Sequence, residues 1–320
     1  MRRRAFIASL LSGAIATAAR AQTGPHISVL HSGFPHRTPI HLLLEALAIL
    51  GYENGRTAQI EVLGGEGNID RLNALVAHLT TQRPQVIIAI TAPAVAALKQ
   101  AGLPIQVVFA FVPDPVGLGL VESLARPAGN FTGTTYGEAD LGGKRLEFLV
   151  DALPATKRVA VLWGGGFPQN LALLESARRF ASARAIEVFA REVRGVGDLA
   201  PAFGDAAQAG AEAVIFLTDN LMFGHRKEVA ELALGHRLPS MHSFGAEVED
   251  GGLMFYGPSL AESYRRSAAL ADRILRGARA GDLPVEQPTK FELIINLRTA
   301  KAMGLMIPES FLLRADEVIE

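Results

Sequence analysis

Short hydrophobic runs alternate with longer amphipathic stretches along almost the whole chain. Runs such as 27–30 and 86–90 are mostly apolar and are bounded by turn residues, which is typical of strands buried in a parallel sheet. The stretches between them repeat their apolar positions at helical spacing. Several have end signals, because Asn68 precedes one stretch and Gly51 follows another. The alternation predicts an α/β fold in which helices flank parallel sheets and the crossovers are right-handed.

The pattern assigns an element to most segments of the chain. We predict strands at residues 27–30, 60–63, 86–90, 105–111, 131–136, 158–163, 187–192, 213–218, 239–244, 253–256 and 291–296. We predict helices at residues 39–50, 69–80, 93–100, 141–152, 171–183, 199–208, 225–234, 260–276 and 297–303. Asp198 and Ser259 are expected to cap the helices that follow them.

The two halves of the chain repeat one architecture. ISVLHSG from Ile27 is echoed by VAVLWGG from Val159, and VIIAITAPA from Val86 is echoed by VIFLTDNLM from Val214. The offset of about 130 residues is the length of one α/β domain. We therefore predict two lobes with a ligand cleft at the carboxyl ends of their strands. The predicted division is 22–136 plus 257–286 for the N-terminal lobe, and 137–256 plus 287–320 for the C-terminal lobe.

The first residues read as an export signal. Three arginines precede an apolar stretch that ends in Ala19-Arg20-Ala21, and the stretch is too short to span a bilayer. Both an ordinary secretory signal and a twin-arginine signal fit residues 1–21. The chain has no cysteine, which excludes disulfides, thiol chemistry and a lipid-anchored export signal. We expect a monomer free in the periplasm, without stable membrane insertion.

Charge and motifs exclude several classes of function. The net charge is -1 and no basic block is present, so a nucleic-acid partner is not expected. The dinucleotide fingerprint fails at Gln169, where it needs glycine, and no Walker pattern exists. Ser32 and Ser243 lack the context of a hydrolase nucleophile elbow. His26, His31, His36 and His41 recur every five residues, which suits no familiar metal site. We expect neither a metal nor a cofactor.

The candidate ligand contacts lie in the loops after the predicted strands and among nearby aromatic residues. They are Ser32, Gly33, Phe34, Thr91, Ala92, Asp114, Tyr136, Gly165, Phe167, Asn170, Thr218, Asp219, Asn220, Phe244 and Tyr256. The helix start at Thr91 offers backbone N–H groups to a carboxylate, and Asp219 offers a partner to an ammonium group. Glycine after the second-lobe strand lets a ligand approach the backbone closely. The aromatic rings can cover an apolar part of the ligand.

Each candidate also has a purely structural explanation. Thr91 and Asp219 can simply cap the helices that follow them, and Asp114, between two prolines, can fix a rigid turn. Any single aromatic residue is more often part of a core than of a binding site.

Several long motifs resemble one family. They are PDPVGLGLVESLARPAGNFTG from Pro113, GGKRLEFLVDALP from Gly142, GGLMFYGPSL from Gly251, LPVEQPTKFELIINLRTAKAMGL from Leu283 and LLRADEVIE from Leu312. These segments are similar to the ABC-transporter substrate-binding proteins related to tryptophan and tyrosine binders. The resemblance covers nearly the whole chain after residue 21, although the loops after residues 32 and 164 depart from the usual pattern.

The resemblance implies a type I periplasmic-binding fold with two Rossmann-like lobes and no catalysis. It implies that the protein delivers a small molecule, such as an aromatic amino acid, to an ABC permease and its ATPase. It also implies ligand contacts at Thr218, Asp219 and Asn220 and at Thr91 and Ala92. Two alternatives remain open at this point: an exported α/β hydrolase or reductase on the same scaffold, and a ligand-sensing partner of a signalling receptor.

Overall fold

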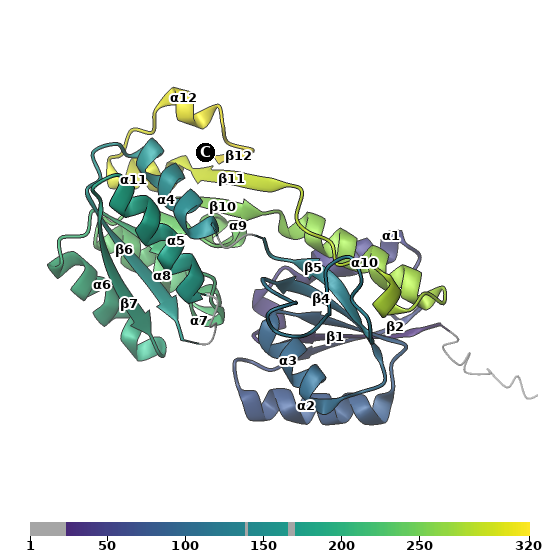
Figure 1. Ribbon diagram of the computed structural model, residues 1–320. Helices are drawn as coiled ribbons and strands as arrows, with labels where there is room; N and C mark the ends of the chain where they lie inside the picture. Colours follow the sequence, from purple (N-terminus) through teal and green to yellow (C-terminus); the bar gives the residue numbers. More distant parts are fainter. Residues whose placement is uncertain (1–23, 138–139, 166–169) are drawn as a thin grey trace, which may run out of the picture.

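Two twisted sheets, each flanked by helices, lie side by side in the computed structural model (Figure 1). The structure describes residues 24–137, 140–165 and 170–320. The predicted export signal, residues 1–21, therefore lies outside the described residues, as does Phe167. The two sheets confirm the predicted α/β fold with two lobes.

The first sheet is parallel throughout and has the strand order β2-β1-β3-β4-β5. Its strands are β1 (His26–His31), β2 (Gln59–Gly64), β3 (Val86–Ile90), β4 (Gln106–Val112) and β5 (Phe131–Thr135). The helices that follow its strands are α1 (Ile40–Ile49), α2 (Ile69–Gln82) and α3 (Ala92–Ala101), with the short 3-10 helix η1 (Pro35–Arg37) ahead of α1.

The second sheet has the order β12-β11-β10-β9-β8-β6-β7. Its strands are β6 (Arg158–Gly164), β7 (Glu187–Val193), β8 (Ala213–Phe216), β9 (Ser240–His242), β10 (Met254–Pro258), β11 (Phe291–Asn296) and β12 (Glu317–Ile319). Its helical elements are α4 (Leu141–Ala152), α5 (Asn170–Ala183), η2 (Val196–Asp198), α6 (Leu199–Gln208), α7 (Asn220–Gly224), α8 (Arg226–Gly235), α9 (Gly245–Glu249), α11 (Leu297–Met303) and α12 (Glu309–Leu312).

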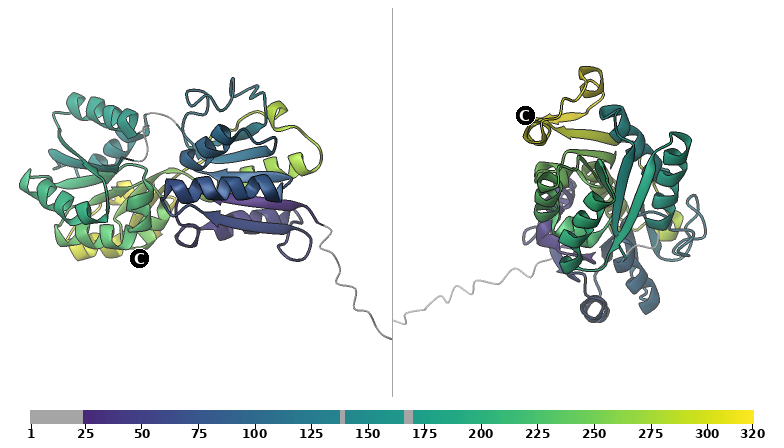
Figure 2. Two further views of the ribbon diagram at one scale, coloured as in Figure 1. Left: turned by 90° about the horizontal axis from the view of Figure 1, so that it is seen from below. Right: turned by 90° about the vertical axis from the view of Figure 1, so that its left-hand side faces the viewer.

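The strand orders support the internal repeat. β2-β1-β3-β4-β5 in one sheet corresponds to β7-β6-β8-β9-β10 in the other, so each lobe places its second strand outside its first. This is a doubly wound order, in which ligands bind beyond the carboxyl ends of the strands. The two lobes lie side by side (Figure 2). Because β1, β3, β6 and β8 end toward the space between them, residues far apart in the sequence meet there.

The tail of the chain serves both lobes. In the first lobe, α10 (Leu260–Leu275) packs against α1, β3, β4 and β5 and is followed by η3 (Ala280–Asp282). The later residues extend a sheet instead. β11 pairs antiparallel with β10, and β12 pairs with β11. The expectation of a wholly parallel second sheet was wrong at this edge, because the added strands satisfy the open backbone groups of β10.

The chain passes between the lobes several times. It crosses between β5 and α4, between β10 and α10, and again between η3 and β11. We propose the division into lobes made above, with one boundary shifted, because Gly257 and Pro258 still pair with β11. Crossings of this kind act as hinges for opening and closing of two lobes.

The predicted helix caps are only partly correct. Asn68 and Ser259 each accept a hydrogen bond from a backbone N–H three residues on, as expected. Asp198 makes no such cap and accepts from the backbone N–H of Arg194 instead, at 3.0 Å. The short elements α7, α9, α12 and β12 were not predicted, because they span too few residues to show a hydrophobic period.

Gly142 allows α4 and α5 to pack closely. A Cβ atom at Gly142 would lie 1.9 Å from the carbonyl oxygen of Leu173, whereas one at Gly204, in α6, would meet nothing within 4 Å. We predict that Gly142→Ala lowers the free energy of unfolding by about 1–3 kcal/mol, the usual cost of overpacking. Gly204→Ala, the matched control, should raise it by roughly 0.5–1 kcal/mol. Denaturant unfolding of both variants measures this, and equal effects would contradict the packing argument.

Candidate ligand-binding site between the lobes

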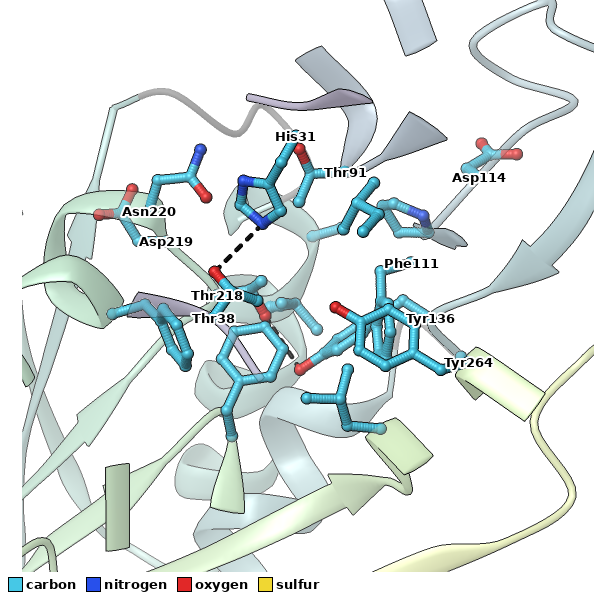
Figure 3. Close-up of a pocket in the computed structure, with 18 residues that line it drawn as sticks. His31, Thr38, Thr91, Phe111, Asp114, Tyr136, Thr218, Asp219, Asn220 and Tyr264 are labelled. Carbon is cyan, nitrogen blue, oxygen red and sulfur yellow. Dashed lines mark hydrogen bonds between the residues drawn. The ribbon is translucent and has the colours of Figure 1, made fainter. Parts of the chain in front are cut away.

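A cavity of about 260 Å³ lies between the two lobes (Figure 3). Its first-lobe wall is formed by the ends of β1, β3 and β4, and its second-lobe wall by the segments after β8 and β9 and by the start of α5. Tyr136 and Gly137, at one crossing, and Leu260 and Tyr264, from α10, complete the lining. Both lobes and their connections therefore build the same site.

The first-lobe wall holds strained backbone. Thr91 has φ 78° and ψ 154°, a region that residues other than glycine rarely adopt, and Phe111 on the neighbouring strand has φ 60°. Such strain costs about 1–3 kcal/mol per residue and clusters at functional sites. The Thr91 side chain makes no helix cap, so that alternative was wrong. Its hydroxyl shares a 2.5 Å hydrogen bond with the Ser32 hydroxyl, and Thr91 lines the cavity.

Asp219 caps a helix and also lines the cavity. Its Oδ1 accepts hydrogen bonds from the N–H groups of Leu221, at 2.6 Å, and Met222, at 3.0 Å, so it caps α7. Asp219 also lines the cavity, and the residue is 5% exposed. Burial raises the pKa of Asp219, and the two cap bonds work against that rise. Because both bonds use Oδ1, Oδ2 is left for another donor.

Gly164 makes room for Asp219. A Cβ atom at Gly164 would lie 2.1 Å from Asp219 Oδ2. Glycine at this position therefore lets the side chain of a neighbouring strand end approach. Close approach of a ligand to the next residue, the candidate Gly165, stays a prediction.

Aromatic rings form the apolar part of the wall. Phe111, Tyr136 and Phe244 contact one another with ring centroids 6.1–6.3 Å apart. Phe223 meets Phe244 edge-on at 5.1 Å, and Tyr264 meets Phe111 edge-on at 5.7 Å. All of these side chains line the cavity. Rings packed edge to face present both faces and edges to a ligand ring.

Arg145 orients the Tyr136 side chain through a hydrogen bond to its hydroxyl. It is fully buried in α4, donates to the Tyr136 hydroxyl at 2.5 Å through Nη2, and donates to the Tyr256 carbonyl at 2.9 Å through Nε. The Tyr136 hydroxyl also accepts from the Thr218 hydroxyl at 3.0 Å. Sequence reasoning missed Arg145, because an arginine on an amphipathic helix ordinarily faces solvent.

Glu247 fixes the loop that carries Phe244. Its Oε2 accepts from the backbone N–H groups of Ser243, at 2.9 Å, and Phe244, at 2.8 Å. Burial raises the pKa of Glu247 to about 7, against the opposing effect of these hydrogen bonds and of Arg145. Burial, with Arg145 acting in the same direction, lowers the pKa of the adjacent His242 to about 3, so that ring is neutral.

His31 is a wall residue that we had considered only as a metal ligand. Its Nδ1 accepts from the Gly33 N–H at 2.8 Å, and burial lowers the pKa of His31 to about 4. The ring is therefore neutral at pH 7, and its Nε2 lies 3.4 Å from the Thr38 hydroxyl. A polar residue inside the buried run of β1 was the signal that could have identified it.

The structure brings about half of the sequence candidates to this cavity. Those that line it are Thr91, Asp114, Tyr136, Thr218, Asp219, Asn220 and Phe244. Asp114 also accepts from the Gly117 N–H at 2.8 Å, as the turn explanation required. Ser32, Phe34 and Gly165 line a neighbouring hollow of about 510 Å³, which Asp219 and Asn220 share.

Other candidates lie in supporting positions. Tyr256 stacks on Phe148 with centroids 4.2 Å apart, so for this ring core packing was the better explanation. Asn170 donates to the Thr218 carbonyl at 2.9 Å, Gly33 bonds His31, and Ala92 begins α3.

Hydrogen bonds join the lobes beside the cavity. The Asn220 amide donates to the Ser32 hydroxyl at 2.9 Å. Arg37 donates to the Gly224 carbonyl at 2.6 Å, and Arg226 donates to the Arg37 carbonyl at 2.8 Å. Since Ser32 and Arg37 belong to the first lobe and the others to the second, these bonds hold one side of the cleft together.

The charge of the site has one sign. The described lining contains Asp114 and Asp219 and neither lysine nor arginine. Across the described ranges, no group of three or more His, Asp or Glu residues gathers in a way that could hold a metal ion. The site therefore suits a ligand that carries a positive charge or hydrogen-bond donors.

A match to a protein family decides the identity of the chain. Residues 37–319 match the family described as ABC transporter substrate binding protein. The chain belongs to this family. It is the substrate-binding component of an ABC transporter, and the resemblance seen in the sequence motifs is confirmed.

Relatives of this substrate-binding protein include a protein named tyrosine-binding protein from Clostridioides difficile. It is 26% identical over 264 residues, which cover 82% of this chain and 75% of the relative. A structure from Streptococcus pneumoniae described as an ABC domain in complex with L-Trp has a TM-score of 0.82 at 23% identity, with coverage of 93% of this chain and 100% of the other.

Two further structures share the fold of the substrate-binding protein. A conserved domain protein from Vibrio cholerae has a TM-score of 0.84 at 24% identity and covers 92% of this chain and 99% of its own. A ligand-free, open substrate-binding protein with adhesive properties from Clostridium difficile has a TM-score of 0.67 at 21% identity, with coverage of 92% and 99%. In the part of the chain that the structure describes, no helix has the length and apolar character needed to cross a membrane.

The raised pKa of Glu247 gives the substrate-binding protein a pH-dependent stability. Between pH 4.5 and about 7 the folded protein keeps a proton that the unfolded chain releases, so the contribution of Glu247 is full at low pH and falls as pH rises. Glu247→Gln keeps an oxygen acceptor and cannot ionise. We predict that wild type loses stability relative to Glu247→Gln as the pH rises through this range. The difference between their free energies of unfolding, wild type minus variant, should fall by on the order of 3 kcal/mol. Denaturant titrations at several pH values measure it, and a constant difference would contradict the assignment.

Proposed function

We propose that this substrate-binding protein captures an aromatic amino acid in the cavity between its lobes and delivers it, unaltered, to the permease and ATPase of its transporter. The observation that carries the proposal is the placement of a buried carboxylate, Asp219, and a cluster of aromatic rings in one cavity of about 260 Å³. The names of the relatives, a tyrosine-binding protein and a domain in complex with L-Trp, point to the same class of ligand.

The ammonium group of the ligand would lie at Asp219. Oδ1 is committed to the cap of α7, so Oδ2 accepts from the ligand. A charge-assisted hydrogen bond in a buried site is stronger than one in water. Ammonium binding would also favour the ionised carboxylate, and so would offset the rise in the pKa of Asp219 that burial causes.

The carboxylate of the ligand would lie at the first-lobe wall. Thr91 lies at the start of α3, a helix of ten residues whose positive dipole end faces this side of the cleft. The Ser32 hydroxyl can donate the hydrogen of the 2.5 Å bond that it shares with Thr91, which leaves the Thr91 hydroxyl as a donor that adds no charge. The lining has no basic side chain among the described residues, so backbone and hydroxyl groups fill this role.

Binding would favour closure of the lobes. A ligand that contacts Thr91 in one lobe and Asp219 in the other has its full set of contacts only when the lobes are together, and so it shifts the equilibrium toward the closed form. The Asn220–Ser32 bond and the Arg37 and Arg226 bonds are contacts of that form.

We also propose that the protein works in the periplasm as a monomer, after export by residues 1–21, and that it does not alter its ligand. The candidate nucleophiles support the last point. The Ser32 hydroxyl is bonded to Thr91 and Asn220, neither of which is a base, and the acceptor nitrogen of His31 is occupied by Gly33. A sensing role would use the same ligand contacts.

The Asp219 carboxylate tests the proposed function most sharply. Asn is a good helix cap, so Asp219→Asn should keep α7 while losing the charge. We predict that titration calorimetry finds binding of L-tyrosine, L-phenylalanine or L-tryptophan to the wild-type protein. The affinity for that ligand should fall by about 10–150-fold in Asp219→Asn, which corresponds to a loss of about 1.5–3 kcal/mol of binding free energy. Asp151→Asn, at an exposed pair with Arg314, is the matched control and should bind as wild type does.

A ligand analogue completes this test. The deaminated form of the bound amino acid should lose a similar factor with the wild-type protein and should bind wild type and Asp219→Asn alike, because each change removes the same interaction. Failure of all three amino acids to bind would reject the aromatic amino acid as the ligand. Binding that is unaffected by Asp219→Asn would reject Asp219 as the ammonium partner.

A further inference from the structure

Tyr264 reaches the cavity from the tail of the chain. It lies on α10, is 0% exposed, and packs edge-on against Phe111 with centroids 5.7 Å apart at 79°. Figure 3 shows its hydroxyl pointing into the cavity, on the opposite side from Asp219. The residue is absent from the sequence candidates, because it lies inside a helix and the candidates were taken from the loops after the strands and from aromatic residues near them.

The hydroxyl of Tyr264 has no hydrogen-bond partner in the protein. Its neighbours differ in this respect. The Tyr136 hydroxyl is bonded to Arg145 and Thr218, and on α10 itself Ser263 pairs with the Thr134 hydroxyl at 2.8 Å. A buried polar group without a partner costs free energy, so an unpaired hydroxyl in a cavity wall indicates a partner that occupies the cavity.

The phenol of Tyr264 is suited to donate. Burial raises its pKa above the ordinary value, so it stays protonated at any physiological pH. Its ring is held by Phe111, whose own backbone is fixed in a rare conformation with φ 60°, and by the burial of the whole side chain in α10. A hydroxyl carried on a fixed ring has a defined position, which is what discrimination between similar ligands requires.

We infer that Tyr264 is a specificity-determining residue that forms a hydrogen bond with a polar atom at the side-chain end of the ligand, so that the site selects a hydroxylated aromatic ring over an unsubstituted one. The inference rests on the proposed function. The ammonium end is placed at Asp219, and the far end of the ligand then lies toward Tyr264 and Phe111. A ring that bears a hydroxyl meets the unpaired donor, while a plain phenyl ring leaves it unpaired.

The test compares L-tyrosine with L-phenylalanine by titration calorimetry in three proteins: wild type, Tyr264→Phe and Tyr52→Phe. Tyr52 is the matched control, because its hydroxyl bonds Asp272 at 2.8 Å and lies outside the cavity lining. We predict that wild type binds L-tyrosine about tenfold or more tighter than L-phenylalanine, the effect of one hydrogen bond. Tyr264→Phe should reduce the ratio to about threefold or less, mainly by weakening L-tyrosine, and Tyr52→Phe should keep the wild-type ratio.

Thermal unfolding without ligand is the second measurement. Tyr264→Phe removes an unpaired hydroxyl from an apolar wall, so its midpoint should equal or exceed that of wild type, whereas loss of an internal bond would lower it. Equal wild-type affinities for the two amino acids, or a preference for L-tyrosine that survives in Tyr264→Phe, would overturn the inference while leaving the proposed function intact. If none of the aromatic amino acids binds the wild-type protein, the proposed function fails and this inference fails with it.

Discussion

The buried guanidinium of Arg145 joins segments that form the cavity between the lobes. It donates from α4 to the Tyr136 hydroxyl at the first crossing between the lobes and to the Tyr256 carbonyl in β10, at the second. A charge that is 0% exposed is costly without partners, so the bonds from Nε and Nη2 favour an arrangement in which both acceptors lie against Arg145. The aromatic wall formed by Tyr136, Phe111 and Phe244 depends on this arrangement, and the crossings it joins are those about which the lobes would move.

Several features of the site cost free energy, and the surrounding fold holds them in place. Thr91 and Phe111 hold rare backbone conformations on adjacent strands, and the Thr91 N–H donates to the Ala110 carbonyl at 3.0 Å, so the sheet keeps both in place. Asp219 keeps a carboxylate away from water, and Tyr264 keeps a hydroxyl without a partner. Each feature costs free energy in the protein alone, and the proposed ligand would offset the costs at Asp219 and Tyr264 by supplying their missing partners.

The sequence predicted the lobes and part of the site for a clear reason. Short apolar runs define strands, and parallel strands end at one edge, so the sequence could place Thr91, Asp219 and Asn220 at the edge where the cavity lies. Tyr264 and Arg145 could not be placed, because their positions depend on how α10 and α4 pack and not on any local pattern. Tyr256 does not line the cavity, because β10 delivers its ring to a stack with Phe148.

The central claim is that the cavity between the lobes is the site of ligand capture. A crystal structure of the protein grown with its tightest-binding aromatic amino acid tests this most directly. The account predicts density for the intact ligand between Asp219 and the rings of Phe111 and Phe244, with both lobes in contact with it. The claim would be contradicted by ligand density found only on the outer surface of one lobe or only in the neighbouring hollow lined by Ser32, Phe34 and Gly165. Density in the cavity for a chemically altered ligand would contradict it as well.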